Sequence, residues 1–228
     1  NLPLTKKLYF RGTLSNYKTD GFIYNNFNMT DDSNGKDERL LKINFLRKAN
    51  KNKTVNYFLY LIDMNNKYNQ WSPDNNGYTT YTDFQGYDTQ KTTALSINKT
   101  IKLENGVLNS ISSYSDNKMK YSYDGDWAND VYWENAPYNW PDDYPYSFPD
   151  VTNRNKRQKS KEIRYSNEDI TLGFYISEIQ ETDIRKGWIF AGYDYLNSKF
   201  TINNSSIYLQ IIDNTNSKTN INTTIRFD

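Results

Sequence analysis

The residues that could do chemistry begin with the acidic segment DGDWAND at positions 124–130, which places three carboxylates and one amide within seven residues. Calcium takes six to eight oxygen ligands, often from a loop of this kind. Asp124, Asp126 and Asp130 are therefore candidate calcium ligands, and we expect no other cofactor. The spacing departs from an EF-hand loop, and Asp side chains in turns also cap their own backbone. The alternative is a turn that holds no metal.

A concentration of aromatic rings surrounds this segment. Residues 121–150 contain three of the five Trp, six of the 21 Tyr and four of the six Pro. Trp and Tyr faces bind the apolar face of a sugar ring while nearby Asp and Asn accept hydroxyl hydrogen bonds, and proline stiffness lowers the entropy lost on binding. With a second aromatic turn at 71–78, the candidate ligand-binding residues are Trp71, Trp127, Tyr132, Trp133, Tyr138, Trp140 and Tyr144. The alternative is that these rings pack as a lid on one end of the protein.

The absence of both Cys and His removes much of enzyme chemistry. Disulfides, thiol nucleophiles, His-dependent triads and zinc sites built on Cys or His are excluded. Glycoside hydrolysis survives, because it needs only two carboxylates. No motif joins Glu134, Glu178 or Glu181 into such a pair, so we expect a protein that is not an enzyme, with a jelly-roll glycoside hydrolase as a third alternative.

The charge balance limits the partners. With 28 basic and 27 acidic residues the net charge is +1, which argues against a nucleic-acid partner held by counterion release. No apolar run approaches the 18 residues of a membrane-spanning helix, so we expect no membrane insertion.

The hydrophobic pattern alternates with the period of β-strands almost throughout. Asn105-Gly106 is the strongest hairpin signal, and residues 48–53 are expected to form a second, solvated hairpin loop. About a dozen short strands with frequent turns predict an all-β fold of the sandwich or jelly-roll type, with a long loop rich in Pro and aromatic residues.

A single domain covering residues 1–228 is expected, with a long insertion around 124–161. Within that insertion, residues 153–161 are predicted to be a basic, solvated loop. The alternative is two packed halves, 1–150 and 162–228.

Two functional hypotheses follow for a secreted, cell-surface or virion-surface protein. The first is an adhesion-type module that binds a glycan or surface receptor through its aromatic loop. The second is a structural subunit of a filament, layer or viral shell, which self-assembles with copies of itself by strand complementation. Residues 1–14 and 219–227 are the candidate complementing strands.

Overall fold

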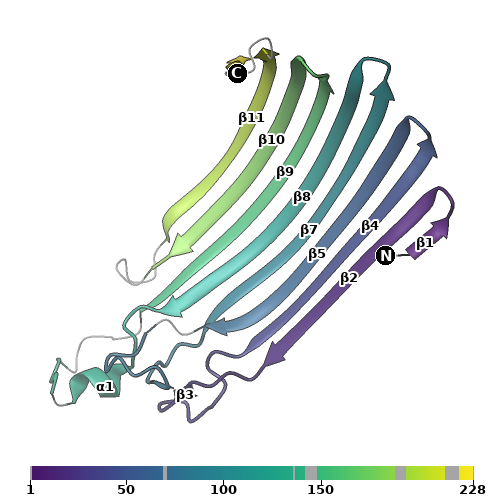
Figure 1. Ribbon diagram of the computed structural model, residues 1–228. Coiled ribbons are helices and arrows are strands. Elements are labelled where there is room, and N and C mark those ends of the chain that lie inside the picture. The colour runs from purple at the N-terminus through teal and green to yellow at the C-terminus, as the bar shows by residue number, and fades with distance from the viewer. Residues whose placement is uncertain are drawn as a thin grey trace.

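The computed structural model describes residues 2–68, 71–135, 137–141, 148–187, 194–213 and 221–227. It confirms the all-β prediction, since the one helix, α1, has five residues (Figure 1). The elements are β1 (Leu2–Thr5), β2 (Leu8–Thr19), β3 (Tyr24–Asn25), β4 (Lys36–Asn50), β5 (Lys53–Tyr68), β6 (Thr79–Thr80), β7 (Gly86–Leu103), β8 (Gly106–Asp124), α1 (Asp130–Glu134), β9 (Pro149–Ser166), β10 (Ile170–Lys186), β11 (Asp194–Asp213) and β12 (Ile221–Phe227).

Ten strands form one antiparallel sheet in the order β1-β2-β4-β5-β7-β8-β9-β10-β11-β12. Figure 1 shows them side by side as a broad curved sheet, with tight turns at one end. One of these turns is the predicted Asn105-Gly106 hairpin, in which Leu103 pairs with Gly106. The predicted hairpin at 48–53 also forms, and its strands reach Asn50 and Lys53.

The expected sandwich or jelly roll is not confirmed. The described residues form one large open sheet and a two-stranded parallel pair, β3 with β6, instead of two packed layers. The strands are also longer than expected, up to 20 residues in β11. The sequence predicts turns where the hydrophobic pattern breaks, but many of these breaks are polar residues that continue the same strand.

The basic loop predicted at residues 153–161 is wrong, because these residues lie within strand β9. Their cationic side chains meet acidic partners on the neighbouring strands. Arg154 pairs with Asp183 at 2.6 Å, Arg157 with Asp116 at 3.2 Å, and Lys159 with Glu178. β9 also pairs with β8 and β10 along its length, so one sheet runs through the proposed domain boundary.

The two faces of the sheet differ in chemistry. Directly paired residues share a face, so the register defines rows that cross the sheet. One row reads Asn44, Phe58, Ser96, Ser113, Ser160, Ser177 and Asn204. The next row, on the opposite face, reads Phe45, Tyr57, Ile97, Ser112, Lys161, Ile176 and Ser205. We call the face that carries Phe45 the apolar face and the other the polar face.

The apolar face carries a band of large side chains that no other element covers. Among the described residues, the only buried hydrophobic ones are Ala128 and Trp133, and both lie outside the sheet. Exposed large side chains on the apolar face include Leu14, Tyr57, Leu95, Ile97, Ile163, Ile170, Leu172, Phe174, Ile176, Ile207 and Ile211. The sheet therefore has no core of its own among the described residues.

The longer connections gather at the end of the sheet opposite the tight turns. They contain β3, β6 and α1, which Figure 1 shows close together at that end. Asn25 ties two of them together, because its side-chain amide donates to the carbonyl of Thr82 at 2.8 Å. In the part of the chain that is described, no helix is long and apolar enough to cross a membrane.

Candidate ligand-binding cap

We use the name aromatic cap for the described parts of two connections, residues 71–85 between β5 and β7 and residues 125–141 between β8 and β9. The short helix α1 lies in the second connection. Asn129 caps the helix, since its side chain accepts a hydrogen bond from the backbone N–H of Tyr132 at 3.0 Å. The amide of Asn129 also donates to the carbonyl of Tyr81, which joins the two connections.

Part of the aromatic cluster is the core of the cap. Trp133 is 7% exposed and packs with Ala128, and its ring stacks on Trp140 at 4.4 Å between centroids. Tyr81 and Tyr132 lie at 4.7 Å and flank the same core. For Trp133 the packing alternative therefore describes the structure, because its indole has little surface left for a ligand.

Other predicted binding residues remain accessible. Trp71 and Trp127 stack at 5.4 Å with an angle of 24° between their planes, and they are 57% and 38% exposed. Trp140 and Tyr138 are also exposed beside the core. Residues 71 and 127 lie far apart in sequence, so their stacking is a result of the fold. Tyr144 lies outside the described residues.

Trp127 adopts an unusual backbone conformation. Its φ is +70°, in the left-handed region that residues other than Gly seldom occupy. Such conformations cost about 1–3 kcal/mol each and cluster at binding sites, where the surroundings impose them. Here the carboxylate of Asp126 accepts hydrogen bonds from the backbone N–H groups of Ala128 and Phe148, at 3.1 and 3.0 Å, and so fixes the loop around Trp127.

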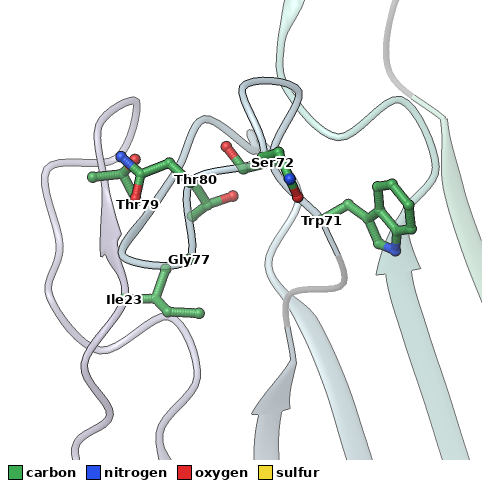
Figure 2. A pocket seen from close by; sticks show the side chains of 8 residues that line it. Ile23, Trp71, Ser72, Gly77, Thr79 and Thr80 are labelled. Carbon is green, nitrogen blue, oxygen red and sulfur yellow. The ribbon is translucent and has the colours of Figure 1, made fainter.

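A small pocket opens beside Trp71. Its volume is about 200 Å³, and it is lined by Ile23, Trp71, Ser72, Asn75, Asn76, Gly77, Thr79 and Thr80. Figure 2 shows Ile23 and Gly77 on one side, with the Trp71 indole projecting on the other. The lining combines an indole with hydroxyl and amide groups. Ile23 and Thr79 were missed by sequence reasoning, because neither residue carries a local signal and only the pairing of β3 with β6 brings them together.

The turn that carries Trp71 is held by a network of hydrogen bonds around Asp74. Ser72 donates to this carboxylate at 2.5 Å and Tyr81 at 3.0 Å. The bond from Ser72 makes the largest contribution to lowering the pKa of Asp74 below its ordinary value. The lowered pKa favours the ionised carboxylate, which accepts the hydrogen bonds from Ser72 and Tyr81 that hold the turn.

The predicted calcium ligands lie close together but are engaged with the protein. Asp126 binds backbone N–H groups as described above, and Asp124 contacts the Thr82 hydroxyl and accepts from the backbone N–H of Asp126 at 3.3 Å. In the described residues no group of three acidic side chains has the geometry to hold a metal ion. The capped-turn alternative thus accounts for the contacts of Asp124 and Asp126, and calcium binding stays a prediction.

Burial changes the protonation of the acidic groups beneath the cap. Burial, and then the charge of Asp126, raise the pKa of Asp124 to about 8. Burial, followed by the charges of Asp126 and Asp130, raises the pKa of Asp83 to about 6. The raised pKa of Asp124 favours its protonated form at neutral pH, in which it can donate a hydrogen bond.

The candidate glycosidase carboxylates are not brought together. Glu178 lies on the apolar face of β10, paired with Lys159 at 3.7 Å, and Glu181 lies on the polar face, 3.4 Å from Arg154. Glu134 lies in α1 at the cap. Two carboxylates on opposite faces of a sheet cannot act on one glycosidic bond.

Comparison with known proteins gives a likeness in fold. No family model and no curated protein matches the sequence. Among solved structures, the chain is similar to the crystal structure of the ferric yersiniabactin uptake receptor FyuA from Yersinia pestis, with a TM-score of 0.73 and 15% identity. The match covers 98% of this chain and 34% of that receptor, so the chain spans about a third of the receptor's length.

Proposed function

We propose that this chain forms part of the membrane-embedded wall of a cell-surface receptor, with the aromatic cap as its outward-facing binding site. The observation that carries the proposal is the uncovered band on the apolar face. Fully burying a Leu, Ile or Phe side chain contributes about 1.5–3 kcal/mol, and large exposed apolar patches mark sites of protein or membrane contact. The hydrocarbon of a bilayer covers such a band without any further protein layer.

The dimensions of the band support a bilayer as the covering. On β10 it runs from Ile170 to Ile176, about 20 Å at 3.4 Å per residue. On β7 it runs from Leu95 to Leu103, about 27 Å by the same rise, and Lys99 interrupts it on the same face. For strands tilted by about 35–45°, these lengths correspond to a height of about 14–22 Å, close to the roughly 25 Å of the lipid-facing bands of transmembrane strands.

The slant of the band supports the same proposal. On β2 and β4 the band includes Leu14 and Leu41, which are directly paired. On β10 it begins at Ile176, which lies four rows nearer the tight turns than Leu41, and it ends at Ile170. A band that crosses the strands obliquely is what strands tilted against a bilayer produce, because transmembrane strands tilt by about 35–45°.

The proposal departs from the sequence expectation of no membrane insertion, which rested on the absence of an apolar run long enough for a helix. An alternating strand exposes apolar residues at every second position and so contains no such run. The edges β1 and β12 would need further strands, because unpaired backbone groups are costly in hydrocarbon. A longer chain or a neighbouring copy can supply them, so strand complementation between copies remains compatible with this proposal.

For the ligand, the cap favours a small molecule with a flat apolar ring face and several hydroxyl groups, such as a sugar. Trp71 and Trp127 offer the ring face, and the adjoining pocket supplies the hydroxyl and amide groups of Ser72, Asn75 and Asn76. A receptor role is consistent with FyuA, which is an uptake receptor. Retention of the glycan hypothesis rests on the chemistry of the cap alone.

Absence of Cys allows a direct test of the membrane-embedded wall, because any introduced thiol is unique. Single variants Leu95→Cys and Phe174→Cys report on the band, Ser96→Cys on the polar face and Ser72→Cys on the cap. Each carries a fluorophore and is reconstituted in vesicles of phosphatidylcholine with brominated acyl chains, which quench fluorophores within the hydrocarbon.

Strong quenching is expected at positions 95 and 174, with little at 96 and 72. If positions 95 and 174 are quenched no more than position 72, the apolar face does not contact lipid and the proposal fails.

A further inference from the structure

A belt of cationic side chains borders the apolar band on the side toward the aromatic cap. One row of paired residues on the apolar face reads Asn16, Arg39, Asp63, Lys91, Lys118, Asn155, Thr182 and Lys199. On the same face, Leu41 and Leu61 lie two residues further toward the tight turns. We call Arg39, Lys91, Lys118, Lys120, Arg157, Lys159 and Lys161 the basic belt.

The acidic residues of this region are matched one to one with cations. Asp37 pairs with Arg39 at 3.4 Å, Asp63 with Lys91 at 3.9 Å, Asp116 with Arg157 at 3.2 Å, and Glu178 with Lys159 at 3.7 Å. Lys118, Lys120 and Lys161 have no ion-pair partner among the described residues, and all three are exposed. Three positive charges are therefore uncompensated in a protein whose net charge is +1.

The belt lies in hollows large enough for a headgroup. A groove of about 790 Å³ is lined by Arg39, Lys91, Lys118 and Lys120, by the carboxylates of Asp37 and Asp63 that pair with two of them, and by polar side chains such as Thr89 and Asn155. A second hollow of about 400 Å³ is lined by Lys159, Lys161 and the apolar Ile176. The second hollow thus joins ammonium groups to the edge of the apolar band, the arrangement that a molecule with a charged head and an apolar tail would fill.

We infer that the basic belt binds the phosphate groups of anionic lipids whose acyl chains cover the apolar band. The inference rests on the proposed function, because only a sheet embedded in lipid brings headgroups to this height. Lysines near an anionic lipid surface contribute about 1 kcal/mol each, which is roughly a fivefold preference per lysine. The belt would select anionic lipids for the layer around the protein and fix the depth of the sheet in the bilayer.

The test measures which lipid surrounds the belt. A fluorophore at Thr93→Cys, which lies between Lys91 and Leu95 on the apolar face, reports local lipid by quenching. The full chain is reconstituted in phosphatidylcholine containing a small fraction of phosphatidylglycerol, with bromine on one lipid or the other. The ratio of quenching gives the enrichment of anionic lipid beside the belt.

Three variants accompany the wild type. The triple variant Lys118→Gln/Lys120→Gln/Lys161→Gln removes the uncompensated charge, and the corresponding Lys→Arg triple variant retains it. The matched control Arg11→Gln/Lys36→Gln/Lys42→Gln removes three charges from the polar face. Tryptophan fluorescence of the cap checks the folding of each.

Wild type, the Arg variant and the polar-face control are expected to enrich phosphatidylglycerol at least fivefold, and 10 mM inorganic phosphate should not displace it. The Gln triple variant in the belt should lose the enrichment. Quenching by the two lipids in proportion to their bulk fractions in the wild type would overturn the belt while leaving the membrane wall intact, as would equal loss of enrichment in the polar-face control. No quenching by either lipid would mean that the proposed function itself has failed.

Discussion

Replacement of Asp124 by Asn is expected to abolish a pH dependence that is built into the cap. Asp124 is 6% exposed and contacts the hydroxyl of Thr82. That hydroxyl also lies 2.8 Å from the carbonyl of Phe84, and the backbone N–H of Phe84 donates to it at 3.2 Å. The single hydroxyl proton can be donated either to the Phe84 carbonyl or to the Asp124 carboxylate, so a protonated Asp124, which its raised pKa favours, can donate to the hydroxyl while the hydroxyl donates to Phe84. An Asn amide can donate the same hydrogen bond without titrating.

The sign and size of the effect follow from the pKa. Because the folded-state pKa of Asp124 is raised to about 8 from an ordinary value of 3.8, the folded state binds a proton that the unfolded state releases. Its contribution is complete below about pH 4 and is lost as pH rises to 8. The difference of about 4 pKa units, at 1.36 kcal/mol each, is on the order of 5 kcal/mol. Asp83, with a pKa raised to about 6, adds to the same trend at lower pH.

The assay is urea unfolding followed by tryptophan fluorescence between pH 4.5 and 9, since Trp127 and Trp133 lie within nine residues of position 124. Wild-type cap stability should fall by several kcal/mol across this range, whereas Asp124→Asn should keep only the decline below about pH 6 that comes from Asp83, be flat above it and be more stable than wild type at pH 8.5. Asp74→Asn is the matched control. The pKa of Asp74 is lowered, so that carboxylate stabilises the cap at high pH and loses its contribution as pH falls. Wild-type stability that is constant or rises from pH 5 to 8, or a steep slope above about pH 6 retained in Asp124→Asn, would refute the reasoning.

Three further predictions concern other parts of the molecule. Trp71→Ala should weaken sugar binding at least tenfold in a fluorescence titration without changing cap stability. Trp133→Ala should destabilise the cap by about 3–5 kcal/mol because it leaves a cavity. Equal losses of stability in the two variants would contradict the separation of binding and packing residues. Asp183→Asn should lower stability by about 1–2 kcal/mol in urea melts, because Arg154 and Arg185 lose a shared partner that is 4% exposed; an unchanged midpoint would show that these guanidinium groups are fully solvated. Gly86→Ala should destabilise the start of β7 by several kcal/mol, since a Cβ there would overlap the carbonyl oxygens of Tyr68 and Ser122, and amide hydrogen exchange that stays slow around β7 would contradict this.

Some features of the fold could be predicted because their cause is local. An Asn-Gly pair requires only its own backbone to turn, and the hairpin between β7 and β8 forms where the dipeptide indicates. Two-residue alternation likewise reveals strands without knowledge of their neighbours. The run at 153–161 was misassigned for the opposite reason, because the acidic partners that let its cations lie in a strand are residues 116, 178, 181 and 183.

The candidate site divides in the same way. Sequence composition pointed to the rings around α1, but it could not separate Trp133, which is buried, from Trp127, which is exposed. That distinction depends on Ala128, Tyr81 and Phe148, which pack around the buried ring. The sequence predicted Trp71 as a binding residue, but only the fold shows that its ring stacks on that of Trp127.

By itself, the sequence determined that the chain is all-β, that it lacks the side chains for thiol and imidazole chemistry, and that its aromatic residues concentrate in one segment. These properties depend on residue type and on the two-residue period of a strand. The tertiary structure decided that the described strands form one sheet with no core among the described residues, that their apolar residues align in one slanted band, and that a basic belt borders it. Register decides these properties, because a shift of one residue in any pairing would move every side chain of that strand to the other face.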